Sequence, residues 1–240
     1  MRPEPRLVIN SSNGKEVMNR FARNALHALC ALLSFALAHG GAAAQSYPTK
    51  PIRLIVPFAA GGGSDVVGRV VAQKLGERLG QQVLVENRPG AGGSIGADQV
   101  AKAAPDGYTL LLGSTSEIAQ YPNLNPKVPY DPVRDFAPIG AIGTVPLVLV
   151  ASETLPAKSV AEVIAFAKAN PGKISFGSAG NGSTTHLAME LFASIAGISM
   201  THVPYKGSAP VVTDLLNGNL QLAIPTMPAV LPHASGGKLK

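Results

Sequence analysis

The pattern that most constrains this chain is a repeated alternation of short β-branched runs, glycine-rich breaks and stretches with helical spacing. The first cycle begins with the run Ile52–Val56, which a glycine-rich break at 57–63 interrupts. Apolar residues then follow at helical spacing, at Val66, Val67, Val70, Val71 and Leu75. Such alternation with short connections predicts an α/β fold, with parallel-rich sheets and helices on both faces.

Later segments repeat the same cycle. Strands are predicted at 82–85, 108–112, 145–151, 173–176, 200–203 and 221–224. Further helices are predicted at about 94–103, 159–170 and 183–196, and one more ends at Leu216. Ser64 is expected to cap the first helix, with Asp65 in its first turn. The Pro- and Asn-rich segment 122–138 is expected to be a connecting segment.

The residues before this pattern are typical of a secretory leader. A short basic stretch begins at Met18, an apolar run covers 25–38, and Ala42–Ala44 fits the small-x-small rule for cleavage before Gln45. The apolar run is too short for a membrane span, which needs about 20 residues. Residues 18–44 are therefore expected to be a signal peptide that directs the protein to the periplasm.

Two features of the leader invite other interpretations. Cys30 follows Leu29 rather than a small residue, and the apolar run continues after it, so lipid attachment is not expected. Residues 1–17 are polar and resemble no targeting element, so they are interpreted as an upstream extension from a mis-assigned start codon.

Composition excludes several classes of function. The net charge is +6, but residues 1–44 contain five basic and two acidic residues, so the mature chain has a net charge of +3. Together with an aromatic content of 5% and no Trp, this charge argues against a nucleic-acid partner. The single Cys excludes a disulfide framework and a multi-cysteine metal cluster.

Glycine and serine gather in the loops that precede the predicted helices. The loops are 61–64, 90–94 and 178–183. A helix N-terminus presents unpaired amide groups and a partial positive charge, so it binds a carboxylate or phosphate without a cationic side chain. Ligands of parallel sheets bind beyond the carboxyl ends of the strands, where these loops lie. The sequence therefore predicts an anion site in a cleft between two domains.

Enzyme and cofactor motifs are incomplete. Val66 stands where a dinucleotide fingerprint needs its third Gly, and no P-loop is present. Ser94 lies in a G-x-S-x-G run, but no strand leads directly into it, as a nucleophile elbow requires. His186 and Glu190 would need a third ligand such as His202 to bind a metal. Asp65 is expected to complement the helix dipole rather than act as a base. No catalytic residue, metal or cofactor is expected.

Several runs resemble one family of binding proteins. They are YPTKPIRLIVPFAAGGGSD at 47–65, VENRPGAGG at 85–93, PDGYTLL at 105–111, YDPVRDF at 130–136, FGSAGNGSTTHL at 176–187 and VPYKG at 203–207. In this order and spacing they resemble the Bug-type receptors, the extracytoplasmic solute-binding proteins of tripartite tricarboxylate transporters. The resemblance covers residues 47–240.

The resemblance implies a two-domain periplasmic-binding-protein fold that closes on its ligand like a flytrap, with domains at 45–144 and 145–240. It implies a receptor, monomeric when complete, that binds a small organic acid in the cleft and delivers it to a membrane permease. The ligand-binding residues that it implies are Phe58, Ala59, Gly61, Gly62, Ser64, Asp65, Ser114, Ser116, Ser178, Ala179, Gly180, Gly182, Ser183 and His186. A carboxylate sensor and a periplasmic hydrolase remain alternative functions.

The chain departs from the family pattern in two places. Many relatives carry two acidic residues in the strand before a Leu-Pro, but here the stretch is QLAIP at 221–225. The loss of these acids argues against an amino-acid ligand. Relatives also continue beyond the position of Lys240 with a returning strand. The second domain and the return hinge are therefore expected to be incomplete, with an open sheet edge at Leu222 and Ile224 and poor solubility.

Overall fold

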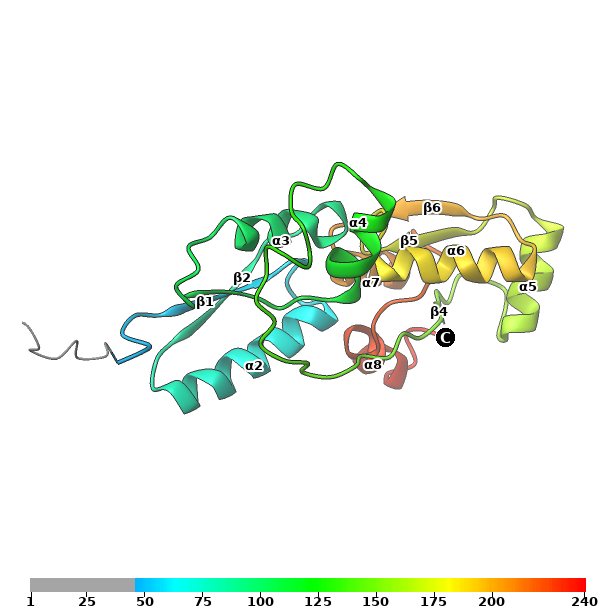
Figure 1. The fold of residues 1–240 in the computed structure, drawn as a ribbon. Helices are drawn as coiled ribbons and strands as arrows, with labels where there is room; N and C mark the ends of the chain where they lie inside the picture. Colours follow the sequence, from blue (N-terminus) through cyan, green and yellow to red (C-terminus); the bar gives the residue numbers. More distant parts are fainter. Residues whose placement is uncertain (1–45) are drawn as a thin grey trace, which may run out of the picture. The chain divides into compact units, whose positions relative to one another are not determined.

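Two β-sheets organise residues 46–240, which are the residues that this computed structural model describes (Figure 1). The strand order is β2-β1-β3 in one sheet and β4-β7-β5-β6 in the other. All strand pairs are parallel except β4 with β7, which confirms the predicted α/β class with parallel-rich sheets. The upstream extension, the signal peptide and its cleavage site lie outside the described residues.

The first sheet has β1 at its centre. Its strands are β1 (Ile52–Val56), β2 (Val83–Asn87) and β3 (Thr109–Leu111), and its helices are α2 (Gly63–Leu79) and α3 (Ser94–Ala101). Leu54 lies opposite Val85 on one side and Leu110 on the other. Leu54 and Val56 pack with Ala72 of α2, so apolar burial holds this helix against the sheet.

The second sheet has apolar layers on both faces. Its strands are β4 (Val150–Ala151), β5 (Ser175–Ser178), β6 (Thr201–Pro204) and β7 (Leu222–Ala223). Its helices are α5 (Val160–Ala169), α6 (Thr184–Ala196), α7 (Ser208–Leu216) and α8 (Met227–Ser235). Leu222 packs with Phe176 in one cluster, whereas Ala223 packs with Leu215 in another. Successive residues of β7 thus face opposite sides, as strand geometry requires.

The expectation of an open edge at Leu222 and Ile224 is wrong. β7 lies inside the sheet, because β4 pairs with one of its sides and β5 with the other. Leu222 is consequently fully buried. Beyond β4, Ala151 and Lys240 exchange two backbone hydrogen bonds of 2.9 and 3.0 Å.

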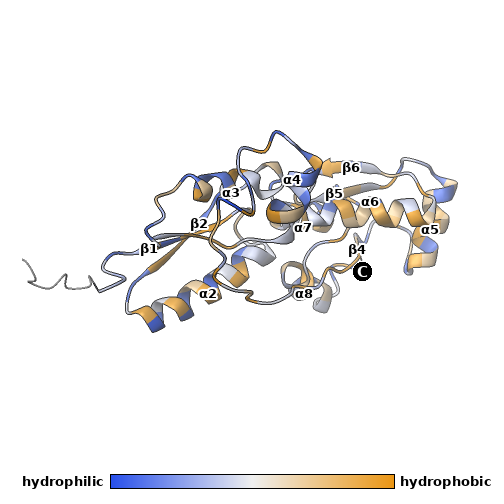
Figure 2. Cartoon of the chain, viewed as in Figure 1, coloured by the Kyte–Doolittle hydropathy of each residue, from blue (hydrophilic) through white to orange (hydrophobic). Residues whose placement is uncertain are grey.

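Three other elements differ from the sequence prediction. The predicted strand 145–151 is regular only at Val150–Ala151, with an isolated bridge between Leu147 and Thr226. A π-helix, η2 (Ser116–Gln120), leads into α4 (Tyr121–Leu124), so the start of the expected connecting segment is helical. The rest of that segment is mostly hydrophilic (Figure 2). Helix α8 was not predicted.

The start of α2 also differs from the prediction. Gly62, not Ser64, is the N-cap residue, and Ser64 lies inside the first turn. The side chain that stabilises this end is Asp65, whose Oδ2 accepts a hydrogen bond from the Gly61 amide at 3.0 Å. An acid at this position also complements the helix dipole.

Residues Pro48–Lys240 form one compact unit. The division into domains at 144/145 therefore stays a prediction, although each sheet draws its strands from one side of that boundary. Between residues 46 and 240, no helix is both long and apolar enough to cross a membrane.

Candidate functional site

The starts of α2 and α6 carry the glycine loops that the sequence singled out. The amides of Gly63 and Ser64 in α2, and of Thr184 and Thr185 in α6, make no hydrogen bond within residues 46–240. These are the amides that an α-helix cannot pair internally. Both helices therefore present donors and a partial positive charge at the loop ends of their sheets.

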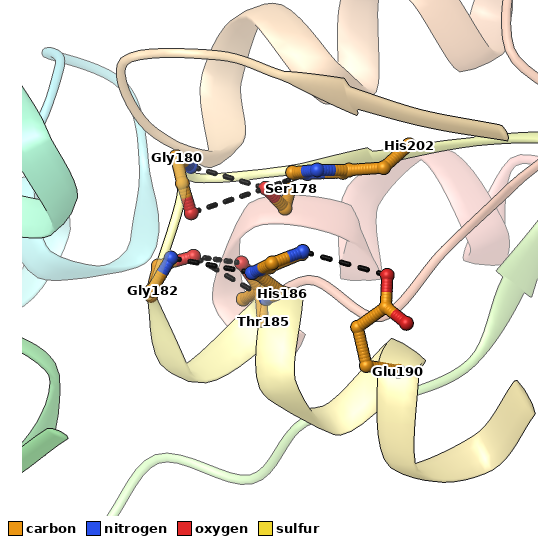
Figure 3. Close-up of polar contacts among 8 residues, drawn as sticks. Ser178, Gly180, Gly182, Thr185, His186, Glu190 and His202 are labelled. Carbon is orange, nitrogen blue, oxygen red and sulfur yellow. Dashed lines mark hydrogen bonds and ion pairs between the residues drawn. The ribbon is translucent and has the colours of Figure 1, made fainter. Parts of the chain in front are cut away.

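The turn 178–183 before α6 is held by its own side chains (Figure 3). The Ala179 amide donates to the Thr185 hydroxyl at 2.8 Å, and the Gly182 amide donates to Nδ1 of His186 at 3.2 Å. Ser183 caps α6, because its Oγ accepts from the His186 amide at 3.3 Å. Several amides that the sequence suggested as ligand donors thus already have partners inside the turn.

Two histidines stack beneath this turn. The rings of His186 and His202 lie 4.0 Å apart, and the Phe176 ring stacks with both, at 4.9 Å from His202 and 6.4 Å from His186. Nε2 of His202 lies 2.7 Å from Oγ of Ser178. Burial, with a smaller effect of nearby His186, lowers the pKa of His202 to about 4, so its ring is neutral near pH 7.

A Ser–His pair is a feature of hydrolases, but this pair is poorly suited to that chemistry. A general base works best when its pKa is near the working pH, whereas the pKa of His202 is about 4. Ser178 is 1% exposed. Ser94, the other serine considered, follows a 3-10 turn at Ala91–Gly93 instead of a strand.

The loop 58–65 after β1 is anchored by Asp65. This carboxylate is 4% exposed and accepts hydrogen bonds from Gly61, Arg69 and Asn87. Burial alone would raise its pKa, but these three hydrogen bonds and the charge of Arg69 outweigh burial and lower it. Asn87 also donates to the carbonyl of Phe58 at 3.0 Å. In this structure the carboxylate of Asp65 thus fixes the loop.

The loop after β3 contains a buried acid that sequence analysis missed. Glu117 is fully buried, and its carboxylate accepts from both the amide and the hydroxyl of Ser114. Burial raises its pKa to about 7, although the Ser114 bonds oppose the shift. The S-x-x-E spacing of a capping box was a usable signal, but burial of the acid depends on the tertiary fold.

Loops of the first sheet touch loops of the second. The Ala59 amide donates to the Lys206 carbonyl at 2.9 Å. Gly92, which accepts a hydrogen bond of 2.8 Å from Ser116 of its own sheet's loops, lies close to the second sheet. A Cβ added to Gly92 would lie 2.9 Å from the Asn181 carbonyl oxygen. A Cβ added to Gly62 would lie 3.7 Å from the Ser208 amide. The starts of α2 and α7 therefore face each other.

The predicted site residues fall into three groups. The turn residues Ser178, Ala179, Gly180, Gly182, Ser183 and His186 lie together, joined by the contacts described above. Phe58 and Glu117 both lie beside Gly93, Ser114 bonds Glu117, and Ser116 bonds the neighbouring Gly92. Ala59, Gly61 and Gly62 adjoin 206–209, while Ser64 and Asp65 begin α2. Glu117 and Ser208 were not among the predicted site residues, whereas His202 was named only as a possible metal ligand and Gly92 only as part of the loop 90–94.

Two other features do not involve these groups. Within residues 46–240, no cluster of three or more His, Cys, Asp or Glu side chains could hold a metal ion. An open groove of about 570 Å³ lies between α2 and β2, lined by residues such as Arg69, Gln73 and Val85. None of the predicted site residues lines it.

Comparison with known sequences identifies a family. Residues 67–240 match the family described as "Tripartite tricarboxylate transporter family receptor". Protein BugT of Bordetella pertussis is 46% identical over 217 residues, which cover 88% of this chain and 67% of BugT. An Agrobacterium vitis UPF0065 protein is 47% identical over 184 residues, or 75% of this chain and 52% of that protein. The chain thus spans between half and two thirds of these relatives.

Solved structures give the same result. Rpa4515 of R. palustris, solved with adipate, superimposes with a TM-score of 0.78 at 39% identity, covering 81% of this chain and 65% of that one. The periplasmic binding protein BugD gives 0.76 at 38% identity, with 81% and 64% covered. MatC from Rhodopseudomonas palustris, with bound malate, gives 0.77 at 31% identity, with 81% and 66% covered.

These comparisons bear on three expectations from the sequence. The resemblance to Bug-type receptors and the periplasmic-binding-protein fold are confirmed. The relatives are described as receptors and binding proteins, not as enzymes, in agreement with the non-enzymatic expectation.

Proposed function

The chain belongs to the tripartite tricarboxylate transporter receptor family, and on this premise we propose that it binds a small carboxylate between the starts of α2 and α6. The proposed contacts are the loops 58–65, 114–116 and 178–186, together with Ser208 at the start of α7. In this proposal the protein is a receptor that passes its ligand to a membrane permease.

One observation supports this proposal most directly. The amides of Gly63 and Ser64, and those of Thr184 and Thr185, have no hydrogen-bond partner within residues 46–240. An anion at a helix start gains from these donors and from the helix dipole together. A carboxylate would therefore be bound without a lysine or arginine.

The ligand class that we propose is a dicarboxylate. Two helix starts, one beside each sheet, provide one anion site for each end of such a molecule. The relatives Rpa4515 and MatC were solved with adipate and malate, which are both dicarboxylates. Gln221 and Ile224 lie in the stretch where many relatives carry acids, and this supports an organic acid over an amino acid.

Calorimetric titration tests the ligand class. Adipate and malate are titrated into the protein, with the corresponding uncharged diamides as matched controls. We expect at least one dicarboxylate to bind, and neither diamide, because only a charged end gains from the helix dipole. Equal affinity for acid and diamide, or no binding of any of a panel of mono-, di- and tricarboxylates, would contradict the proposal.

Export and delivery complete the proposed function. The leader 18–44 would direct the chain to the periplasm, where BugD also acts as a binding protein. N-terminal sequencing of periplasmic protein is expected to begin at Gln45. Retention of the segment 25–38 in a membrane fraction would argue against this. Loss of carboxylate uptake after deletion of the gene tests the permease partner, whereas a sensor would alter gene expression and leave uptake intact.

A further inference from the structure

Ser178 lies at the centre of the hydrogen bonds that shape the turn before α6. Its Oγ is 2.7 Å from Nε2 of His202, 3.2 Å from the Gly180 amide and 3.3 Å from the Gly180 carbonyl. A hydroxyl has a single proton and two lone pairs. The Oγ proton has two acceptors within reach, the Gly180 carbonyl and, at the shortest distance, Nε2 of His202, and in either case a lone pair remains for the Gly180 amide.

The environment of His202 supports its role as an acceptor. The ring stacks with both Phe176 and His186, at centroid distances of 4.9 and 4.0 Å, and those two rings lie 6.4 Å from each other. His186 accepts the Gly182 amide at Nδ1, so its own proton lies on Nε2, which is 3.5 Å from the Glu190 carboxylate. A positive charge on His202 would be buried against the ring of His186.

We propose that His202 is a positioning residue for ligand binding. Its neutral Nε2 accepts the Ser178 proton and so fixes the turn at Gly180. This turn leads into the start of α6, where the Thr184 and Thr185 amides have no hydrogen-bond partner within residues 46–240. The ligand part of this inference rests on the proposed function. The two stacked histidines then act as a pair, because His202 holds Ser178 and His186 holds Gly182.

The position of this turn matters for both halves of the site. Gly180 has a φ of 127°, a conformation that few residues with a side chain adopt, and both its amide and its carbonyl contact Oγ of Ser178. A Cβ added to Gly180 would lie 3.5 Å from the Gly92 amide. A small rotation of the turn would therefore change the spacing between the first-sheet loops and the start of α6.

Three variants separate the hydrogen bond from the ring. His202→Phe keeps an aromatic ring that can stack with Phe176 and His186 but removes the acceptor. His202→Gln loses the ring but keeps an acceptor. His233→Phe, in α8, is a matched control for loss of an imidazole elsewhere.

Nitrogen NMR of the imidazole rings tests the hydrogen bond in the ligand-free protein. We expect His202 to carry its proton on Nδ1, with Nε2 bare. Ser178→Ala should shift the Nε2 signal of His202 and leave that of His233 unchanged. A proton on Nε2 of His202 at neutral pH would overturn the inference, whether or not the protein binds a carboxylate.

Titration with adipate and malate tests the effect on binding. For the acid that binds, His202→Phe should weaken affinity about tenfold, or about 1.4 kcal/mol, while His202→Gln and His233→Phe stay within about threefold of wild type. In a Ser178→Ala background, His202→Phe should cause no further loss, because the effect passes through Ser178. Unchanged affinity in His202→Phe, or an equal further loss without Ser178, would refute the positioning role. Failure of the wild type to bind any carboxylate would refute the proposed function instead, and the NMR result would still decide the role of His202 in the turn.

Discussion

The hydroxyl of Thr184 donates a hydrogen bond of 2.7 Å to Oε1 of Gln120, although the two residues are 64 positions apart. Thr184 is the first residue of α6, and Gln120 is the last residue of the π-helix η2. The bond therefore connects the loop that follows β3 of the first sheet to the helix that follows β5 of the second.

Removing this hydroxyl should destabilise the fold. Thr184→Val keeps the side-chain shape but leaves the Gln120 oxygen without its donor. We expect the free energy of unfolding, measured with urea, to fall by about 1 kcal/mol. Thr213→Val is the matched control, since its hydroxyl donates to the Ala209 carbonyl within its own helix. Equal losses in both variants would show that the contact with Gln120 has no special role.

Gly92 tests the close approach of the two sets of loops. Its φ is 61°, and an added Cβ would lie 2.9 Å from both the Asn181 carbonyl oxygen and the Tyr121 ring. Gly197 has nearly the same φ, 63°, but nothing within 4 Å of an added Cβ. Both Gly→Ala variants should incur a backbone cost of about 1–2 kcal/mol.

The overpacking at Gly92 should add at least about 1 kcal/mol to that cost, measured as the difference in unfolding free energy between the two variants. Because the added methyl group separates loops of the two sheets, Gly92→Ala should also weaken dicarboxylate binding, whereas Gly197→Ala should not. Indistinguishable variants would mean that the loops move apart freely.

Glu117 predicts how stability depends on pH. Burial raises the pKa of this carboxyl from 4.5 to about 7 in the folded chain. Between these values the folded state binds more protons than the unfolded state, so its stability is greatest at the acid end and falls as pH rises. Glu117→Gln cannot titrate, so its unfolding free energy relative to wild type should increase from pH 4.5 to 7.

The exposed Glu77 provides the control for this measurement. Glu77→Gln makes the same substitution at an exposed position of α2, and so controls for the change of Glu to Gln itself. Urea denaturation at half-unit pH steps measures both variants. A constant difference between Glu117→Gln and wild type across this range would contradict a raised pKa.

Local signals account for what could be predicted from the sequence. β1 matches its predicted range of 52–56, and the helices predicted from 159 and 183 begin at Val160 and Thr184. These features depend on β-branched runs, turn residues and cap side chains, all within a few positions of the element. The glycine loops were recognisable for the same reason, and they led to most of the candidate site.

The features that were missed depend on distant residues. α8 has Pro228 at its start and Pro232 inside it, so its local pattern argues against a helix. The burial of Glu117 and the pairing of His202 with Ser178 each require segments that meet only in the folded chain. The expected edge at Leu222 was wrong because strand order, which local patterns do not specify, places β7 between two neighbours.

Two helix caps separate stability from binding. Ser159 caps α5 by accepting from the Glu162 amide at 3.2 Å, and Ser183 caps α6 by accepting from the His186 amide at 3.3 Å. Ser159→Ala and Ser183→Ala should each lower the free energy of unfolding by about 1 kcal/mol.

Only Ser183 lies at the proposed ligand site, where it also contacts the Thr185 hydroxyl at 3.1 Å. Ser183→Ala should therefore weaken dicarboxylate binding about tenfold, and Ser159→Ala should leave it unchanged. Calorimetry at a temperature where both variants remain folded measures the affinities, and equal affinities would place the ligand away from the start of α6.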